Sequence, residues 1–353
     1  MAKGDLLWAS GFDNRDVGLF DLTTGNAAFA TTAPRTPRST AYFAPSGVSG
    51  SVFSLAASIS EFMIGFGFMT NSTAPTAGFM NIFSQNNSNN FNIALNGSGK
   101  LRVTRNGTLL ATGGTTLAVD TWYWLWLYVL IADSGFYRLY LDDNPEIVGG
   151  SNLAASGDTR ADAGTNGNLC DRINIGNSAS YQIDDMYVFD ATGSHANASS
   201  DGDDVVSGIT ATDSDRTIPY LIPTSDGNYA QLTPSTGSSH FALVDEIPPN
   251  TTDFNSHATN GNKDSYGMSN LTNAAGVDGV VARAVVQKSD AGAKSGRIIL
   301  RSSGSDQNGA DVALSSGATW TRARWFLAKS PFTSSAWTVS EINAIEEGWE
   351  VRA

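Results

Sequence analysis

The feature that most constrains the fold is a series of short alternating stretches separated by turn residues. Phe91–Leu95 and Leu101–Arg105 alternate apolar with polar residues, and Asn106-Gly107 follows the second stretch. Asn and Gly both tolerate the positive φ of a type I′ turn, so this dipeptide between alternating stretches predicts a β-hairpin. We therefore expect a three-stranded meander over residues 91–112.

A second stretch, Trp122–Ile131, is apolar on both of the faces that a strand would have. Trp and Tyr occupy the even positions from 122 to 128, and the odd positions also carry large apolar side chains. Such a strand needs cover on both sides, so we expect Trp124 and Trp126 to be buried. Many short strands with frequent turn signals are typical of a β-sandwich or jelly roll.

Composition favours the same class and excludes some functions. Charged residues make up 16% of the chain, against a usual share of about 25%. Gly, Asn, Ser and Thr carry much of the polarity, and these residues favour turns over helix interiors. The formal net charge of −13 would repel a polyanion, so we expect no nucleic-acid binding and no attachment to an anionic membrane.

Few residues are available for thiol or metal chemistry. Cys170 is the single cysteine, and the three histidines, His195, His240 and His257, lie in polar, loop-like sequence. The chain begins without the apolar segment of a signal peptide, and its longest apolar run, Trp122–Ala132, is shorter than the roughly 20 residues of a membrane span. We expect a soluble protein that is made in a cytosol and inserts into no membrane.

The composition changes after the first half of the chain. Residues 193–215 are rich in Gly, Ser, Asn and Asp and poor in large apolar residues, which predicts a linker or long loop. It would separate a first domain, 1–192, from a second domain, 216–353. The candidate strands of the second domain are Thr217–Ile222, Val280–Lys288, Gly296–Arg301 and Arg322–Leu327.

A helix is predicted near the C-terminus, over residues 339–348. Thr338 and Glu341 have the spacing of a capping box, in which each side chain caps the backbone N–H of the other residue. Ile342, Ile345 and Trp349 then share one helical stripe, which we expect to pack against the second domain's own sheet. The second domain is therefore predicted to be β-rich and sandwich-like, with this helix at its end.

Two passages resemble strands of concanavalin A-like or laminin G-like jelly rolls. One is Trp122–Ile131 with the following Phe136–Asp142, and the other is Ile183–Val188, which has the apolar-Asp-Asp-apolar-Tyr-apolar pattern of the final strand in such domains. The complete layout is similar to that of a group of tailed-bacteriophage virion proteins, in which a second β domain follows the jelly roll. The matching landmarks are Pro223–Tyr229, Val244–Glu246, Asn262–Tyr266, Lys288–Gly292 and Ala336–Asn343.

The resemblance implies both a fold and a function. The fold is all-β: a concanavalin A-like (laminin G-like) jelly-roll sandwich followed by a second β-rich domain with a short C-terminal helix. The function is that of a non-enzymatic virion structural protein of the tail, baseplate or fibre, which contacts other virion subunits and forms a homo-oligomer. Two alternatives stay open, namely a capsid decoration protein and a carbohydrate-binding module that contacts a host-surface glycan.

Four acidic residues are the candidates for a metal site. Asp142 and Asp143 follow a strand at a turn, where the wider laminin G-like group often binds Ca²⁺, but a hairpin turn explains the same residues. Asp184 and Asp185 are adjacent on a strand, so alternation places one toward solvent and one toward a neighbouring backbone loop. We expect structural roles for these residues and no bound cofactor, with Ca²⁺ as the alternative.

No combination of residues predicts catalysis. The Glu-x-Asp-x-x-Glu strand of laminarinase-type jelly rolls does not occur, and no G-x-S-x-G elbow lies between a strand and a helix. The stretch Trp122–Tyr128 could form a sugar-stacking platform, but its two apolar faces favour the core. Tyr229, Phe241 and Tyr266 are expected in loops, where binding residues are common, and they stay as unranked candidates for a binding site.

Overall fold

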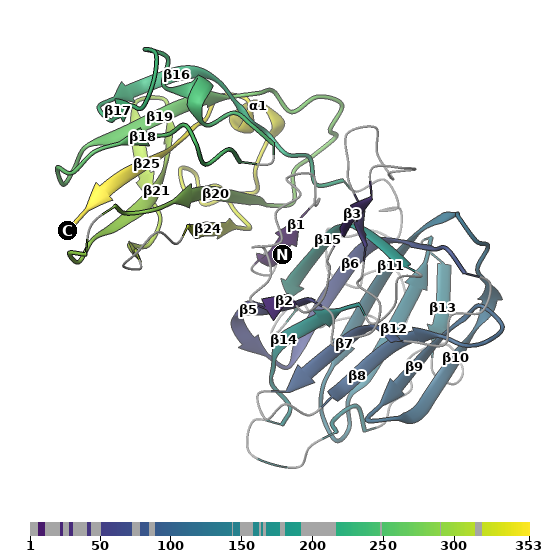
Figure 1. Ribbon diagram of the computed structural model, residues 1–353. Helices are drawn as coiled ribbons and strands as arrows, with labels where there is room; N and C mark the ends of the chain where they lie inside the picture. The colour runs from purple at the N-terminus through teal and green to yellow at the C-terminus, as the bar shows by residue number, and fades with distance from the viewer. Residues whose placement is uncertain are drawn as a thin grey trace. The chain divides into compact units, whose positions relative to one another are not determined.

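The computed structural model divides into two compact units, Met1–Ile218 and Pro219–Ala353. Both are built almost entirely from antiparallel strands (Figure 1). The predicted linker, 193–215, lies outside the described residues. The structure describes residues 6–10, 22–23, 28–30, 41–43, 51–72, 78–84, 89–142, 144–148, 158–161, 164, 167–176, 181–191, 217–247, 249–289, 291–314 and 320–353.

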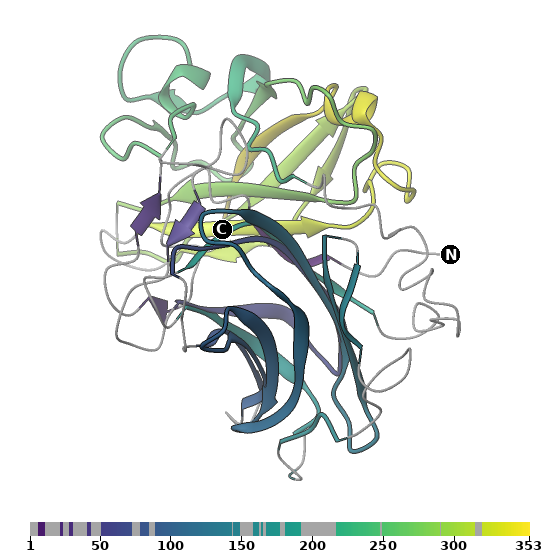
Figure 2. The same cartoon turned by 90° about the vertical axis from the view of Figure 1, so that its right-hand side faces the viewer.

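The first unit is a sandwich of two antiparallel sheets, which Figure 2 shows as two layers. Its strands are β1 (Leu6–Ser10), β2 (Leu22–Thr23), β3 (Ala28–Ala30), β4 (Ala41–Phe43), β5 (Ser51–Ile59), β6 (Glu61–Thr70), β7 (Gly78–Ser84), β8 (Asn89–Leu95), β9 (Lys100–Arg105), β10 (Thr108–Thr116), β11 (Trp122–Leu130), β12 (Phe136–Leu141), β13 (Asn144–Val148), β14 (Cys170–Ile175) and β15 (Tyr181–Asp190). One sheet has the order β13-β12-β11-β6-β15-β4-β3, with β1 also paired to β15, and the other has the order β10-β9-β8-β7-β14-β5-β2. Strands far apart in sequence are therefore neighbours in both sheets, as in a jelly roll.

Aromatic side chains fill the space between the two sheets. Phe66 and Phe68 of β6 lie 6.2 and 4.4 Å, between ring centroids, from Phe79 of β7 in the opposite sheet. Phe91 of β8 meets Tyr137 of β12 edge-on at 5.1 Å. These contacts remove the alternating apolar side chains of both sheets from water. Burial of apolar surface is the main favourable term in folding.

The aromatic stretch forms β11, in the middle of its sheet between β6 and β12. Trp124 and Trp126 are 2% and 4% exposed, which confirms that this strand is covered on both faces. Gly67 and Gly65 of β6 pair with these two tryptophans. A Cβ atom on Gly65 would lie 2.3 Å from the ring of Tyr187, so glycine is required where the aromatic side chains cross β6.

The predicted meander is formed by β8, β9 and β10, which are adjacent in that order. Asn106 and Gly107 have φ values of 43° and 84°, and both are exposed. Arg105 pairs directly with Thr108 across this two-residue turn. The type I′ hairpin expected from the dipeptide is confirmed.

Within its described residues, the second unit contains a six-stranded sheet, two separate pairs of strands and two short helical segments. Its elements are β16 (Pro223–Ala230), β17 (Thr233–Pro234), η3 (Phe241–Leu243), β18 (Asn255–Ser256), β19 (Lys263–Met268), β20 (Val280–Val286), β21 (Ser295–Ser302), β22 (Ser305–Asn308), β23 (Val312–Ala313), β24 (Thr321–Leu327), α1 (Val339–Ile342) and β25 (Glu346–Arg352). The sheet has the order β16-β19-β25-β21-β22, with β23 also paired to β21. The two separate pairs are β17 with β18 and β20 with β24.

One hydrophobic core joins these parts of the second unit. Ala282 of β20 packs with residues of β21, β24 and the α1 segment. The buried members of this core are Ala282, Ile298, Leu300, Ala323, Leu327, Trp337, Ile342 and Ile345. The six-stranded sheet therefore has one face against the core, and the opposite face is polar.

Two predictions for the second unit are wrong. The candidate strand 217–222 does not form, and the strand of this region is β16, which begins at Pro223. The helix predicted over 339–348 ends at Ile342, and the chain returns as β25. Gly348 disfavours a helix interior, whereas as part of β25 the same segment pairs on both edges, with β19 and with β21. Within the described residues, no helix is long and apolar enough to cross a bilayer.

One half of the predicted capping box is confirmed at Thr338, while the reciprocal bond from the N–H of Thr338 to the Glu341 side chain does not form among the described residues. Thr338 is the N-cap, and its Oγ1 accepts a hydrogen bond from the backbone N–H of Glu341 at 3.1 Å. The carboxylate of Glu341 accepts a hydrogen bond from the hydroxyl of Ser330. Ile342 and Ile345 are buried in the core, as expected, and Trp349 packs against the same core from β25.

Candidate binding faces

One of the two candidate metal ligands at the turn after β12, Asp142, has an observable structural role. Asp142 has a φ of 46°, and its Oδ1 accepts the backbone N–H of Trp124 at 2.7 Å. The N–H of Asp142 donates in turn to the carbonyl of Trp124 at 2.8 Å. Asp143 lies outside the described residues. The turn is thus tied to β11 through its first aspartate, and Ca²⁺ binding here stays a prediction.

Asp184 and Asp185 are both buried, at 0% and 2% exposure, so the prediction that one of them faces solvent is wrong. A bulge between Asp184 and Tyr187 interrupts the alternation of β15, and Asp185 has a φ of 48°. The Oδ1 of Asp184 accepts the N–H of Asp185 at 2.9 Å. The Oδ1 of Asp185 accepts the N–H of Ile218 at 2.7 Å, which is the expected bond to a neighbouring backbone segment.

Within the described parts of the chain, no group of three or more His, Cys, Asp and Glu side chains is placed to hold a metal ion. Cys170 is fully buried, and this burial raises the pKa of its thiol. The thiol is therefore a packing group of β14, remote from water.

A row of polar side chains crosses the outer face of the seven-stranded sheet. Asn174 of β14 pairs with Asn81 of β7, Asn81 pairs with Asn92 of β8, and Asn92 pairs with Thr104 of β9. We call these four residues the amide row. The alternate residues of the same strands, among them Ile82, Ile93 and Val103, are fully buried on the inner face.

Hydrogen bonds connect the members of the amide row. Nδ2 of Asn92 donates to Oδ1 of Asn81 at 2.6 Å and to the carbonyl of Met80 at 3.1 Å. Oγ1 of Thr104 donates to Oδ1 of Asn92 at 3.4 Å. The side chain of Asn92 also explains why residue 78 is glycine. A Cβ atom on Gly78 would lie 2.3 Å from Nδ2 of Asn92.

An aromatic ring and two guanidinium groups flank the amide row. Phe83 of β7 pairs with Arg172 of β14 one step along the same face, and Arg102 precedes Thr104 by two residues on β9. All three flanking residues are partly exposed, and Leu109, opposite Thr104, is 57% exposed. This face therefore offers hydrogen-bond donors, acceptors and an apolar ring side by side.

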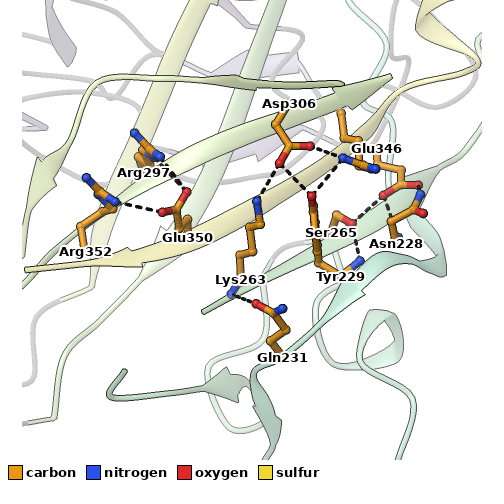
Figure 3. Close-up of polar contacts among 11 residues, drawn as sticks. Asn228, Tyr229, Gln231, Lys263, Ser265, Arg297, Asp306, Glu346, Glu350 and Arg352 are labelled. Atoms are coloured by element: carbon orange, nitrogen blue, oxygen red, sulfur yellow. Dashed lines mark hydrogen bonds and ion pairs between the residues drawn. The ribbon is translucent and has the colours of Figure 1, made fainter. Parts of the chain in front are cut away.

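The second unit has its own polar sheet face, on the side opposite the core (Figure 3). Glu350 of β25 pairs with Lys263 of β19 and with Arg297 of β21. Arg301 of β21 pairs with Glu346 on one side and with Asp306 of β22 on the other. We call this surface the charged face, and its members are Lys263, Ser265, Arg297, Arg301, Asp306, Glu346, Glu350 and Arg352.

At one end of the charged face, Glu350 holds two arginines. Its Oε2 accepts from Nε and Nη2 of Arg297 at 3.1 and 2.9 Å, and its Oε1 accepts from Nη1 of Arg352 at 3.0 Å. Glu350 is 5% exposed. Both donors of Arg297 reach the same oxygen, and this charge-assisted contact crosses directly between two paired strands.

At the other end, Tyr229 of β16 lies among three charged residues. Lys263 Nζ and the Tyr229 hydroxyl both donate to Oδ2 of Asp306, at 2.6 and 3.0 Å (Figure 3). Nη1 of Arg301 donates to Oδ1 of Asp306 and to the Tyr229 oxygen. Burial alone would raise the pKa of Asp306, but the hydrogen bonds from Lys263, Arg301 and Tyr229 lower it below the ordinary value.

The ring of Tyr229 also binds both cations. Lys263 Nζ lies 3.9 Å from the ring centroid, and Cζ of Arg301 lies 4.9 Å from it. These are cation–π distances, and they hold the two side chains flat against the sheet. Beside this group, Oε2 of Glu346 accepts a hydrogen bond from the hydroxyl of Ser265 at 2.5 Å and another from the backbone N–H of Asn228 at 2.9 Å.

The three candidate aromatics have different positions. Tyr229 and Tyr266 lie on β16 and β19, so their placement in loops is wrong, while Phe241 begins η3. Tyr266 is 9% exposed, and its hydroxyl donates to Oδ2 of Asp264 at 3.3 Å. The same oxygen lies 2.6 Å from Nδ1 of His240, and Oδ1 of Asp264 accepts two backbone N–H groups. Tyr266 thus belongs to a buried structural cluster.

No protein-family model matches the chain, and no curated protein matches it. A sialidase of Trypanosoma rangeli, solved with 2,3-difluorosialic acid, is 13% identical over 46% of this chain and 26% of its own length, with a TM-score of 0.32. Domain 4 of the arabinanase AbnA of Geobacillus stearothermophilus, solved with arabinotriose, is 14% identical over 53% and 93%, with a TM-score of 0.35. The carbohydrate-binding module CBM66 of Bacillus subtilis is 16% identical over 48% and 97%, with a TM-score of 0.30. Identity and TM-score are low in all three, so this likeness assigns the chain no ligand and no activity.

Proposed function

We propose that this chain is a non-enzymatic binding protein and that the amide row of its first unit binds a neutral glycan. The observation that carries the proposal is the row itself, in which side-chain amides from neighbouring strands lie in register on an outer sheet face. This placement corresponds to the carbohydrate-binding alternative that the sequence left open for the jelly roll.

The chemistry of the row suits sugar hydroxyls. Each hydroxyl both donates and accepts hydrogen bonds, and a carboxamide offers two donors and a carbonyl acceptor on one planar group. The guanidinium groups of Arg102 and Arg172 add donors on either side of the row. The ring of Phe83 supplies an apolar surface for the C–H face of a sugar ring. None of the four members of the row carries a charge, which favours a neutral ligand.

A purely structural role is the competing account, because bonds such as Asn92 to Asn81 also join neighbouring strands. The two accounts differ in what a substitution changes. Binding of the full-length chain to an array of neutral gluco-, galacto- and manno-oligosaccharides should fall at least tenfold in Asn81→Ala and in Phe83→Ala. The control Thr108→Ala, at an exposed position beside the hairpin turn, should bind like the unmodified chain.

Melting temperatures of the same variants complete the test. If Asn81→Ala and Phe83→Ala stay folded but bind as tightly as the control, the amide row is not the glycan site. If the unmodified chain retains none of the arrayed sugars, the glycan-binding proposal fails. Incubation with the sugars that bind should release no shorter products, because the proposal includes no hydrolysis.

We further propose that the chain is a structural component of a tailed-phage virion, in contact with other virion subunits and with further copies of itself. The sequence landmarks of the second half support this proposal. Its test is the location of the chain on intact particles, for example by gold-labelled antibodies in electron microscopy. Labelling at the tail, baseplate or fibres is expected, and labelling at the head would favour the decoration protein.

A further inference from the structure

Arg301, on the charged face, has more hydrogen-bond donors than the protein uses. Its Nη1 donates to Asp306 and to the Tyr229 oxygen. Its Nε is buried and has no hydrogen-bond partner. Nη2 also makes no hydrogen bond to the described residues, although the side chain is only 16% exposed. One complete edge of the guanidinium, Nε with Nη2, is therefore without an acceptor.

The surrounding residues hold this edge in a fixed orientation. Asp306 and Tyr229 bind the opposite side of the guanidinium, and the Tyr229 ring lies under its Cζ atom at 4.9 Å. A buried N–H without an acceptor is unfavourable, and an incoming acceptor would remove that cost. Two parallel N–H groups on a planar guanidinium match the two oxygens of a carboxylate, which is the usual geometry of bidentate recognition.

The neighbouring charges limit what can bind there. Arg301 lies between Asp306 and Glu346 on the paired strands, and the ammonium of Lys263 shares Asp306 with it, so two positive and two negative side chains meet here. The chain as a whole carries a formal net charge of −13. A ligand with many negative charges, such as an acidic peptide or a sulfated polymer, would be repelled by the two neighbouring carboxylates and by the net charge of the chain. A single carboxylate needs only the guanidinium edge and adds one negative charge to this balanced group of side chains.

We propose that the Nε–Nη2 edge of Arg301 binds the carboxylate of an acidic saccharide, such as a terminal hexuronate. Asn308 supports a saccharide, because its side chain is exposed and lies on the same face of β22 as Asp306, two residues away. Its amide can bind the hydroxyls beside a sugar carboxylate. This site is separate from the amide row and does not depend on the neutral glycan proposed for it.

The probes are a glucuronate-terminated oligosaccharide and its glucose-terminated counterpart, which differ only in the carboxylate. Both are titrated into the full chain at low salt by calorimetry. We expect the glucuronate compound to bind at least tenfold more tightly than the neutral one. This preference should weaken as salt is added, because the carboxylate and the guanidinium are partly exposed.

Three variants assign the preference to the proposed edge. Arg301→Gln should abolish it, and Arg301→Lys should remove most of it while keeping the positive charge beside Asp306, because an ammonium offers no paired edge. Arg297→Gln is the matched control, since it removes one positive charge from the same face at a residue whose Nε and Nη2 both already donate to Glu350. It should change the preference less than twofold. Melting temperatures establish whether each variant is folded. If Arg301→Gln does not fold, the result for Arg301→Lys decides the test.

Several results would overturn the proposal. One is equal affinity for the glucuronate and glucose compounds in the unmodified chain. Another is an undiminished preference in folded Arg301→Lys. A third is tighter binding of a short oligo-glutamate peptide than of the glucuronate compound, which would make an acidic protein segment the ligand. A chain that binds no neutral sugar at the amide row could still bind the glucuronate compound at Arg301. The failure of one proposal therefore does not imply the failure of the other.

Discussion

The carboxylate of Asp185, on the last strand of the first unit, accepts a hydrogen bond from the backbone N–H of Ile218 at 2.7 Å. Asp185 is 2% exposed and has a φ of 48° at the bulge of β15. The Asp-Asp pair that resembles the final strand of a jelly roll is thus used to bind backbone. Both aspartates are buried at this bulge, and Asp185 fixes the segment that ends the unit.

Replacing Asp185 should therefore change stability. Asp185→Ala leaves the N–H of Ile218 without its acceptor, which costs about 1–3 kcal/mol, and places alanine at a positive φ. Asp185→Asn is the matched control, because asparagine tolerates positive φ and keeps an oxygen acceptor. Urea unfolding of the full chain should rank the asparagine variant between the native protein and the alanine variant. Equal midpoints for all three proteins would contradict the role assigned to this bond.

Short-range patterns predicted much of the first unit. The hairpin at Asn106-Gly107 and the buried strand around Trp124 each depend on a few neighbouring residues, whose turn geometry and alternation are visible in the sequence. The burial of both Asp184 and Asp185 was not visible, because β15 has a bulge after Asp184, and Asp185 lies in it. Alternation alone gives no sign of such a bulge.

The candidate binding faces could not be predicted for a different reason. Asn81 and Asn174 become neighbours only when β7 pairs with β14, and these strands are far apart in the sequence. Arg301 and Glu346 meet in the same way through the pairing of β21 with β25. Each residue alone resembles an ordinary solvent-facing position of a strand. The register between distant strands creates the site, and tertiary packing determines that register.

The N-cap at Thr338 is the part of the predicted capping box that the structure confirms, and a substitution can test it. Thr338→Ala removes the acceptor for the N–H of Glu341 and should destabilise the second unit by about 1 kcal/mol. Thr338→Ser keeps the hydroxyl and should cost much less. Denaturant unfolding gives the free energies, and hydrogen exchange measured by mass spectrometry should place the change in residues 330–345. A loss as large in the serine variant would mean that the hydroxyl is not the stabilising group.

Gly348 is the residue that most clearly separates the strand from the predicted helix. It lies on the central strand β25, where it pairs with Ser265 on one side and Ile299 on the other. A Cβ atom there would lie 1.9 Å from the carbonyl oxygen of Asp264, and the paired backbone cannot move aside. We expect Gly348→Ala to destabilise the second unit by about 1–3 kcal/mol. Gly276→Ala is the control, because a Cβ atom at that position has no atom within 4 Å, and its unfolding midpoint should stay close to that of the native chain.

Glu347 should make the stability of the second unit depend on pH. Burial raises the pKa of this carboxyl from 4.5 to about 7, although its bond from the backbone N–H of Arg283 and the charge of that arginine act in the opposite direction. The folded state thus holds the proton more tightly than the unfolded state. The stabilisation is complete below pH 4.5 and is lost as the pH rises through 7.

The measurement for Glu347 is urea unfolding of the full chain at pH 5 and pH 8. The native second unit should be less stable at pH 8, and Glu347→Gln should reduce the difference between the two pH values, because glutamine keeps an acceptor for the N–H of Arg283 and does not ionise. Other titrating groups contribute equally to both proteins, so they cancel in this comparison. The Asp306 carboxyl, with its lowered pKa, is ionised at both pH values and adds nothing to the difference. An identical pH dependence in the two proteins would show that Glu347 does not carry the effect.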